Sequence, residues 1–385
     1  MVCTNPEGIM KIPIAKTQFS DRVDAELVKV VRSGWVAQGP KVKELEEKLA
    51  GYTGARHAVA VSTGTAALHL AILAYGLTEG DEVIMPSFSF IATANAVVYA
   101  GLRPVFCDID PVTYNIDPDV IETLITERTR AIMPVHQFGM PCDMTKIAQI
   151  AGRHDIKIIE DAACALGSLY NGVPIGKTTG IACFSFHPRK TITTAEGGMI
   201  TTDDISVADR LFRLRNHGDN SSGLSTGKSP GFPDQYGILG FNYRMSDVHA
   251  VLGLDQIDRL EEFTVSRNNI AARYNERLRD MDCLQLPVIP EDNDRCNFQS
   301  YLLRLRSDAP LSRDELVSRL LVRGIGTKQG IPPIHLQSIY TEKVGRVRLP
   351  VTEEVAYDSF FLPIFPALTD REFDYIIGTL RKVLA

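Results

Sequence analysis

Long apolar runs are missing from this sequence of 385 residues, and none reaches the eighteen or so residues that a membrane-spanning helix needs. The first twenty residues also lack the apolar core of a secretory signal. The seven cysteines, at positions 3, 107, 142, 164, 183, 283 and 296, form no C-x-x-C pair, which argues against a zinc ribbon or a redox motif. We therefore expect reduced thiols, a cytoplasmic location and no bound metal.

An excess of positive charge is absent as well. The 41 basic and 47 acidic residues give a net charge of −6, which argues against broad affinity for nucleic acid or for an anionic membrane. Repeats and low-complexity tracts are also lacking. What is present is the composition of a soluble globular protein, 44% hydrophobic and 23% charged, in a chain long enough for two domains.

Short apolar runs alternate with amphipathic stretches from about residue 55 onward. Such β-α alternation predicts an α/β domain with a largely parallel sheet, whose active site lies at the carboxyl ends of the strands. We expect strands at 57–63, 81–87, 103–109, 129–138, 156–163 and 181–187, and helices at 65–77 and 90–101.

The pattern changes beyond about residue 245. Residues 246–281 read as one long helix with Ser246 or Asp247 as its cap. Strand-like residues 297–306 and helical stretches at 312–324 and 369–384 follow. We therefore expect a large α/β domain over 1–245 and a smaller α+β domain over 246–385. Residues 216–234 are rich in Gly, Ser and Pro and indicate a loop.

Two of the strand ends carry residues that suggest a site. The turn "STGTAA" (62–67) follows a strand and opens a helix, so its free amides would favour an anion, although small residues at such a turn often serve packing alone. Asp161 ends the apolar strand of "IIEDAA" (158–163). A carboxylate there needs a partner, which could be magnesium, an arginine or a protonated ring nitrogen, unless it is a structural cap.

Lys190 lies in "FSFHPRKTITTAEGGM", just after another apolar run. Desolvation near a buried sheet edge would favour the neutral amine, which is a nucleophile that forms Schiff bases. The alternative is a lysine whose ammonium group reaches water. The segment "GFNYRMSD" (240–247) places an aromatic and basic turn before a helix, and by itself could be an ordinary cap with a surface arginine.

Together these features match the needs of one cofactor, pyridoxal phosphate. It requires a lysine for its aldehyde, an acid for its ring nitrogen and hydrogen-bond donors for its phosphate, and an aromatic side chain can cover its ring. Asp161 precedes Lys190 by 29 residues, which allows both to follow neighbouring strands. The candidates are Lys190, Asp161, Gly64, Thr65 and Ala66 with Ser185, and Phe90.

Six segments in matching order resemble the DegT/DnrJ/StrS family of sugar-nucleotide aminotransferases, which have the type I fold of pyridoxal phosphate enzymes. They are "STGTAALHLA", "PSFSFIATANAV", "IEDAACALGS", "FSFHPRKTITTAEGGM", "GFNYRMSD" and "LPIFPALTD". The resemblance covers roughly residues 12 to 385. It implies that Lys190 binds the cofactor covalently, that Asp161 pairs with the ring nitrogen, and that Phe90 stacks on the ring.

The resemblance also assigns the remaining cofactor contacts. It implies that Gly64, Thr65, Ala66 and Ser185 cradle the phosphate, and that Asn242 or Arg244 reaches the phosphate of a partner subunit in a homodimer with composite active sites. One departure is Cys164, which stands where the family commonly has His, Gln or Glu near the cofactor's 3-hydroxyl. Because a thiol hydrogen-bonds weakly, we expect this contact to be lost or taken over by water.

The activity implied by the resemblance is transfer of an amino group from an amino acid, with glutamate as the expected donor, to a nucleotide-linked 4- or 3-keto-6-deoxyhexose. The amino sugar would serve glycan, lipopolysaccharide or antibiotic biosynthesis. Alternatives are a cyclitol aminotransferase of the scyllo-inosose type and a non-catalytic regulator that binds pyridoxal phosphate. Lys190 argues against the family's dehydratases, which have histidine there. A P-loop at "GVPIGKT" fails because Asn171 stands where glycine is required.

Overall fold

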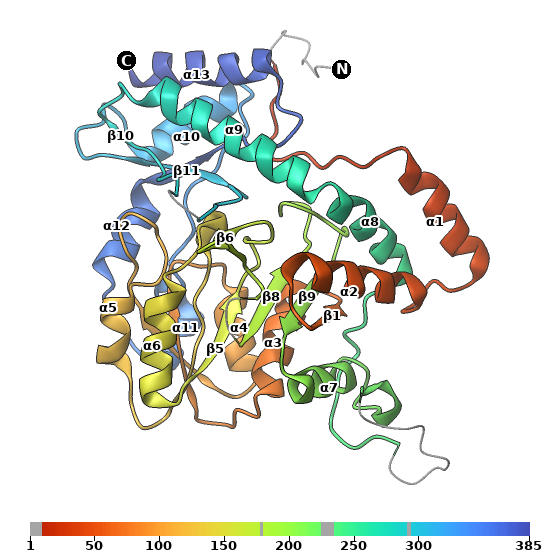
Figure 1. The fold of residues 1–385 in the computed structure, drawn as a ribbon. Coiled ribbons are helices and arrows are strands. Elements are labelled where there is room, and N and C mark those ends of the chain that lie inside the picture. The colour runs from red at the N-terminus through yellow and green to blue at the C-terminus, as the bar shows by residue number, and fades with distance from the viewer. Residues whose placement is uncertain (1–9, 178–179, 225–234, 291–293) are drawn as a thin grey trace.

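The computed structural model describes residues 10–177, 180–224, 235–290 and 294–385. Its centre is a seven-stranded sheet in the order β1-β9-β8-β5-β4-β2-β3, with helices on both faces (Figure 1). The strands are β1 (His57–Val61), β2 (Glu82–Pro86), β3 (Arg103–Cys107), β4 (Thr129–Ile132), β5 (Lys157–Asp161), β8 (Ile181–Ser185) and β9 (Gly198–Thr202). The helices around it are α2 (Pro40–Thr53), α3 (Gly64–Ala74), α4 (Ala92–Tyr99), α5 (Pro118–Ile121), α6 (Met144–His154) and α7 (Ile205–Leu214).

The sheet is mostly parallel, which confirms the predicted α/β class. Five neighbouring strands, β3, β2, β4, β5 and β8, run parallel to one another, while β9 lies antiparallel between β8 and β1. The strand predicted over 129–138 is wrong in its second half, because β4 ends at Ile132 and residues Gln137–Gly139 form a 3-10 turn. Phe138 there has a φ of 57°, which is incompatible with a continuing strand.

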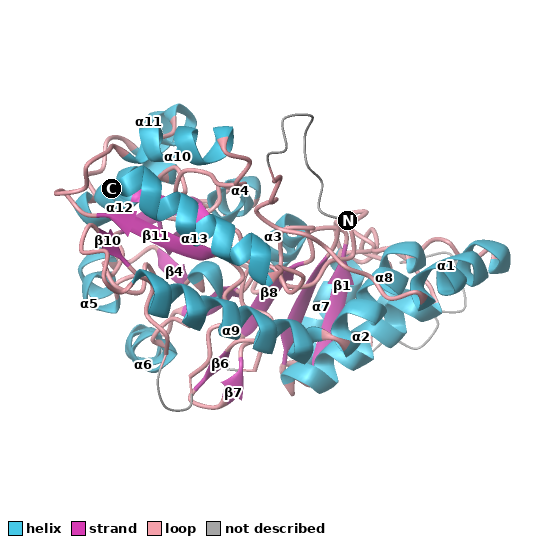
Figure 2. Ribbon diagram, turned by 90° about the horizontal axis from the view of Figure 1, so that it is seen from above, coloured by secondary structure: helices cyan, strands magenta, loops and turns pink. Residues whose placement is uncertain are grey.

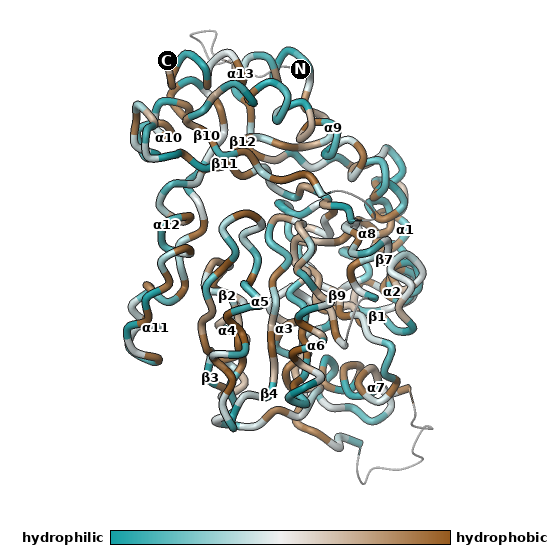
Figure 3. The backbone as a smooth tube through the Cα atoms, turned by 60° about the vertical axis from the view of Figure 1, so that its left-hand side comes forward, coloured by the Kyte–Doolittle hydropathy of each residue, from teal (hydrophilic) through white to brown (hydrophobic). Residues whose placement is uncertain are grey.

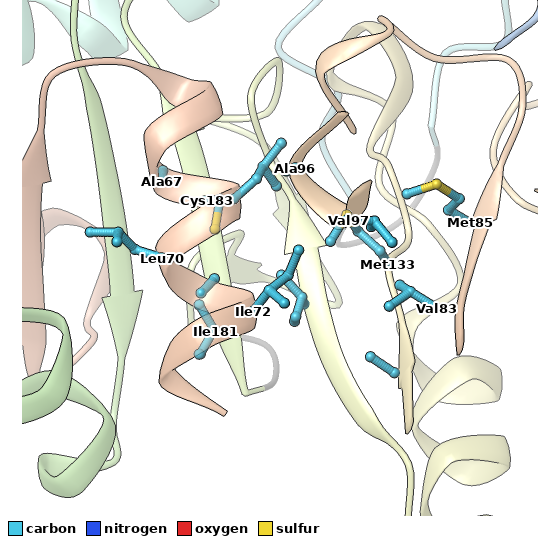
Figure 4. Close-up of a cluster of buried hydrophobic side chains, with 14 of the residues drawn as sticks. Ala67, Leu70, Ile72, Val83, Met85, Ala96, Val97, Met133, Ile181 and Cys183 are labelled. Atoms are coloured by element: carbon cyan, nitrogen blue, oxygen red, sulfur yellow. The ribbon is translucent and has the colours of Figure 1, made fainter. Parts of the chain in front are cut away.

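Helix α3 is the apolar centre of this domain. All but one of its residues from Ala66 to Ala74 are buried, because the helix packs against the sheet on one side and against α4 and α7 on the other. Figure 4 shows side chains of α3 among those of β2, β8 and α4. A helix enclosed in this way must be apolar around its whole circumference, which explains the composition of "TAALHLAILA".

The C-terminal part contains a three-stranded antiparallel sheet covered by helices (Figure 2). Its elements are α8 (Asp247–Asp258), α9 (Leu260–Leu278), β10 (Leu284–Gln285), β11 (Tyr301–Leu305), α10 (Arg313–Val322), α11 (Ser338–Val344), α12 (Pro350–Asp358), β12 (Ser359–Leu362) and α13 (Asp370–Leu384). The tube of α13 changes repeatedly between hydrophilic and hydrophobic along its length (Figure 3), as expected for an amphipathic helix lying on this sheet.

The single long helix predicted over 246–281 is wrong. It is interrupted at Arg259, which leaves the helical region with φ −109° and ψ 4°. The two halves have different packing partners, since α8 contacts α1 (Arg22–Ser33) and α2 of the large domain, whereas α9 contacts α13. Ser246 is the cap, because its hydroxyl accepts a hydrogen bond from the amide of His249.

Chain segments cross between the two apolar cores. Ile12, near the N-terminus, pairs with Ile325 and lies in the core of the C-terminal part, whereas Ile334 and Tyr340 pack in the core around α3. The domain boundary near residue 245 therefore stays a prediction. Of the loop predicted over 216–234, residues 225–234 lie outside the described residues, and the described part includes a 3-10 turn at Asn220–Ser222. Within the described residues, no helix is long and apolar enough to cross a membrane.

Asp247 joins the two parts of the chain at the start of α2. The N-cap position of α2 is Gly39, which has no side chain. The carboxylate of Asp247 takes its place and accepts hydrogen bonds from the amides of Gly39 at 2.8 Å, Lys41 at 3.1 Å and Val42 at 3.0 Å. A buried carboxylate 208 residues away in the sequence thus caps a helix.

We expect Asp247→Ala to lower the free energy of unfolding by about 2 kcal/mol, the upper range for a lost helix cap, because three amides lose their acceptor. Urea denaturation followed by circular dichroism measures the change. Asp258→Ala is the matched control, because Asp258 is an exposed acid at the other end of α8. Its ion pair with Lys48 should contribute little to stability. Equal stability of the two variants would contradict the capping role.

Candidate active site

The candidate site lies at the carboxyl ends of the parallel strands β5 and β8. Asp161 is the last residue of β5 and pairs with Cys183 of β8. Ser185 ends β8, and the chain then turns through residues 186–190 to Lys190. Asp161 and Lys190, which are 29 residues apart in the sequence, therefore lie at the carboxyl ends of adjacent strands. Ligands of open α/β sheets bind at these strand ends.

Asp161 is a buried carboxylate with few protein partners. One of its oxygens accepts a hydrogen bond from the hydroxyl of Thr93 at 2.8 Å, and the other accepts the amide of Ala163 at 3.2 Å. Burial raises the pKa of Asp161, while the Thr93 hydroxyl and the positive charge of Lys190 oppose the rise. A carboxylate in this setting gains from a further positively charged neighbour.

Lys190 is held in a loop that leaves β8 and returns as β9. The amide of Phe186 bonds the carbonyl of Gly197 at 2.9 Å, and the amide of Thr194 bonds the carbonyl of Phe186 at 3.0 Å. Within this closed loop, the Nζ of Lys190 donates to the Sγ of Cys164 at 3.2 Å. The side chain therefore points back toward the loop that follows β5, where Asp161 lies.

Cys164 thus contacts the lysine directly. Its own position is fixed from the C-terminal part, because the side-chain amide of Asn297 donates to the carbonyl of Cys164 at 2.9 Å and to that of Leu166 at 2.8 Å. Asn297 was missed by the sequence analysis, since its partners are more than 130 residues away. A thiol is a weak acceptor, so the contact leaves the Lys190 amine easily displaced.

The predicted phosphate cradle brings Gly64 and Ser185 together. A Cβ atom built on Gly64 would lie 2.7 Å from the Cβ of Ser185, so only glycine fits there. The amides of Gly64 and Thr65 open helix α3 and have no acceptor within the helix. The amide of Ala66 differs, because it donates to the hydroxyl of the N-cap Thr63 at 3.0 Å.

Phe90 lies in the loop between β2 and α4, and 71% of its surface is exposed. Its carbonyl accepts the amide of Thr93 at 3.1 Å, so Phe90 is connected to the residue that bonds Asp161. Thr93 was not among the predicted site residues. Its hydroxyl lies near the start of α4, shortly after the end of β2, and this position was the available signal.

Asn242 and Arg244 are positioned beside a different segment. Asn242 forms a β-bridge with Asn216, and the guanidinium of Arg244 donates to the side-chain carbonyl of Asn216. The amide of His217 bonds the carbonyl of Phe241 at 2.9 Å. These contacts hold the segment of Asn242 and Arg244 against residues 215–217, and the structure describes no hydrogen bond from either of the two side chains to Lys190, Asp161 or Ser185.

A second lysine, Lys328, also belongs to this region. Burial lowers its pKa to about 8, with a further contribution from the charge of Arg189 and a smaller one from Lys190. Its Nζ lies 5.1 Å from the centre of the Phe361 ring, which stabilises a cation. Sequence reasoning missed Lys328, because its segment "GIGTKQG" carries no recognisable chemical signal.

A mostly parallel sheet, with a buried acid and a lysine that follow adjacent strands, is the arrangement of α/β enzymes whose ligands bind at the carboxyl ends of the strands. The chain belongs to the DegT/DnrJ/EryC1/StrS aminotransferase family, whose model matches residues 18–381. This confirms the family predicted from the sequence motifs, and the protein is an aminotransferase.

Known relatives cover nearly the whole chain. GDP-perosamine synthase of Caulobacter vibrioides is 36% identical over 375 residues, which are 97% of this chain and 98% of that protein. The structure of PseC, a Helicobacter pylori aminotransferase involved in the biosynthesis of pseudoaminic acid, matches 97% of this chain and 99% of its own with a TM-score of 0.89 and 25% identity. NtdA of Bacillus subtilis, with the cofactor PMP bound, matches 95% and 83%, with a TM-score of 0.84 and 30% identity.

Proposed function

We propose that the protein is a pyridoxal phosphate-dependent aminotransferase that moves an amino group from an amino acid, with glutamate as the expected donor, to a nucleotide-linked keto sugar. The observation that carries the proposal is the arrangement of Lys190 and Asp161 after two adjacent parallel strands. Lys190 offers an amine that donates to a weak acceptor, the thiol of Cys164, and Asp161 offers a buried carboxylate with a raised pKa.

The residues at this edge of the sheet fit pyridoxal phosphate. The buried carboxylate of Asp161 accepts hydrogen bonds from the Thr93 hydroxyl and from the amide of Ala163, and both of these donors are neutral. A protonated ring nitrogen would supply the positive charge that matches this carboxylate. Gly64 lies so close to Ser185 that the first amides of α3 are beside the Ser185 hydroxyl. Amides at a helix start together with a hydroxyl group suit a phosphate. We infer for Lys190 and Phe90 the roles that the family resemblance implies, for Cys164 a place near the cofactor's 3-hydroxyl without a strong hydrogen bond to it, and for Ala66 a place in the cradle without a free amide.

Pyridoxal phosphate, when bound, supplies an aldehyde that accepts the amino group and a ring that withdraws electrons from the Cα–H bond of the donor. Asp161 would hold the proton on the ring nitrogen, and the Thr93 hydroxyl would keep Asp161 oriented. Lys190 would take the proton from Cα as a base and return it at C4′ as an acid. The second half-reaction passes the nitrogen to the ketone, which makes the kinetics ping-pong.

The names of the relatives support a sugar substrate. One relative makes GDP-perosamine, and another takes part in the biosynthesis of pseudoaminic acid. We infer a nucleotide-linked 4- or 3-keto-6-deoxyhexose as acceptor, with an amino sugar for glycan, lipopolysaccharide or antibiotic biosynthesis as product. Lys328 and Arg189 are the cations available to the carboxylates of the donor or the diphosphate of the acceptor. A cytoplasmic location remains a prediction.

A panel of GDP-, UDP- and dTDP-linked keto sugars, prepared in situ with dehydratases, together with scyllo-inosose, tests the proposal when each is offered with glutamate. We expect amino sugar formation with one nucleotide class. Turnover of scyllo-inosose alone would favour the cyclitol alternative. Binding of the cofactor without steady-state transfer to any ketone would favour a regulatory protein.

We also propose a homodimer with composite active sites. Helix α1 projects from one end of the molecule (Figure 2), and it and the following residues expose the apolar side chains of Val28, Val31 and Trp35. Such side chains on a projecting helix are suited to a second subunit. Asn242 is exposed, so it and Arg244 could reach the cofactor phosphate bound by the partner chain.

Mixed dimers test this arrangement. The double variant Asn242→Ala, Arg244→Ala should bind pyridoxal phosphate more weakly, and Lys190→Ala should lack activity. When the two are co-expressed with different tags, one site of each mixed dimer collects both changes and the other collects neither. We therefore expect purified mixed dimers to recover up to about half of the wild-type activity, as one intact site of two. Activity no higher than the average of the parents would show that the segment serves its own chain.

A further inference from the structure

A small cavity lies beside Lys190, and apart from that lysine it shares no residue with the proposed cofactor site. Its volume is about 20 Å³, enough for one group the size of a water molecule and too small for a phosphate or a sugar. The N-terminal segment covers it on one side, where the side-chain amide of Gln256 donates to the carbonyl of Gln18 at 2.7 Å. This segment runs past α9 and α8 before it enters α1 (Figure 1).

Two residues that line this cavity carry buried hydrogen-bond donors that have no partner among the described residues. They are the hydroxyl of Thr191, which follows Lys190 directly, and the Nε–H of Arg267 on α9. Thr191 is 7% exposed and Arg267 is 3% exposed. A buried donor without a partner costs about 1–3 kcal/mol, and more when the group is charged, so an acceptor bound in the cavity would be stabilised by both donors.

The charge around the cavity is positive. Among the described residues, the Nη1 of Arg267 donates to three backbone carbonyls, those of Phe298, Gln299 and Ile364, at 3.0–3.3 Å. Burial lowers the pKa of Arg267 to about 10, so it remains charged near neutral pH. Among the described residues that line the cavity, Lys16, Lys190 and Arg267 are basic and none is acidic.

We propose that this cavity binds a monovalent anion of chloride size, held by the Nε–H of Arg267 and the hydroxyl of Thr191. A water molecule could accept both hydrogen bonds but would leave the buried positive charge uncompensated, whereas an anion meets both requirements. The anion connects three parts of the fold, since the cavity is lined by the N-terminal segment, the Lys190 loop and Pro366 of the C-terminal part. The inference is independent of the substrate and of the proposed activity.

Thermal unfolding of the cofactor-loaded enzyme tests the site in solution. We expect the unfolding midpoint to rise saturably with sodium chloride relative to sodium gluconate at equal ionic strength. Thr191→Val keeps the shape of the side chain but removes the donor, and should weaken chloride binding about tenfold or more, the value of a hydrogen bond to a charged group. Thr191→Ser keeps the hydroxyl and should retain most of the affinity.

Crystals grown in sodium bromide locate the ion. An anomalous peak between the Thr191 hydroxyl and the Arg267 Nε would support the proposal. It would be overturned if that position held only water in bromide, if chloride and gluconate gave the same midpoint, or if Thr191→Val responded to chloride as wild type does.

Discussion

Lys190→Ala is expected to abolish transamination and to lose the covalent bond to the cofactor. In the wild-type protein, borohydride should fix pyridoxal phosphate on Lys190, because its Nζ donates to the weakly accepting thiol of Cys164 and can leave that thiol to react with the aldehyde. Without it, the amine that we expect to move the proton between Cα and C4′ is lost. Peptide mass analysis after reduction, and a coupled assay of amino transfer, measure both effects.

Lys328→Ala is the control for this experiment. Its amine lies in the same region and has a pKa lowered to about 8, so it is the other lysine that could react with an aldehyde. We expect Lys328→Ala to keep the covalent bond at Lys190. Recovery of the reduced cofactor on Lys328, or full activity of Lys190→Ala, would refute the assignment.

The second large effect is expected for Asp161→Asn. The amide preserves the shape and can still accept the hydrogen bond from Thr93, but it has no charge to hold a proton on the ring nitrogen. We expect the rate of proton abstraction to fall roughly a thousandfold or more, which corresponds to about 4 kcal/mol of barrier. Single-turnover measurements with the donor amino acid, followed by the cofactor absorbance, report this step directly.

Thr93→Val is the matched control, since it removes one hydrogen bond to Asp161 and leaves the carboxylate in place. We expect it to slow the same step by about tenfold, in keeping with the loss of one hydrogen bond to a charged group. If Asp161→Asn turned over within a few-fold of wild type, Asp161 would be only a structural cap of the strand end.

The class of fold and the pairing of β5 with β8 could be predicted from the sequence, because buried parallel strands are short apolar runs and their ends carry polar residues. Asp161 and Lys190 were recognisable for the same reason. Asn297 and Lys328 were not, since they reach the region from the C-terminal part and their roles depend on contacts across more than a hundred residues. The interruption at Arg259 arises from a change of packing partner, which no local pattern encodes.

The closed loop between β8 and β9 has a consequence for changes in chain length. Its two ends are joined by backbone hydrogen bonds between Phe186 and Gly197 and between Phe186 and Thr194, and both flanking strands are locked in register by antiparallel pairing. An inserted or deleted residue within 187–193 therefore cannot be absorbed by sliding either strand. A change before Lys190 would shift this lysine along the loop by one residue, about 3.5 Å of chain, and carry its amine away from Cys164. The number of residues in this loop is therefore fixed by the pairing of β8 with β9.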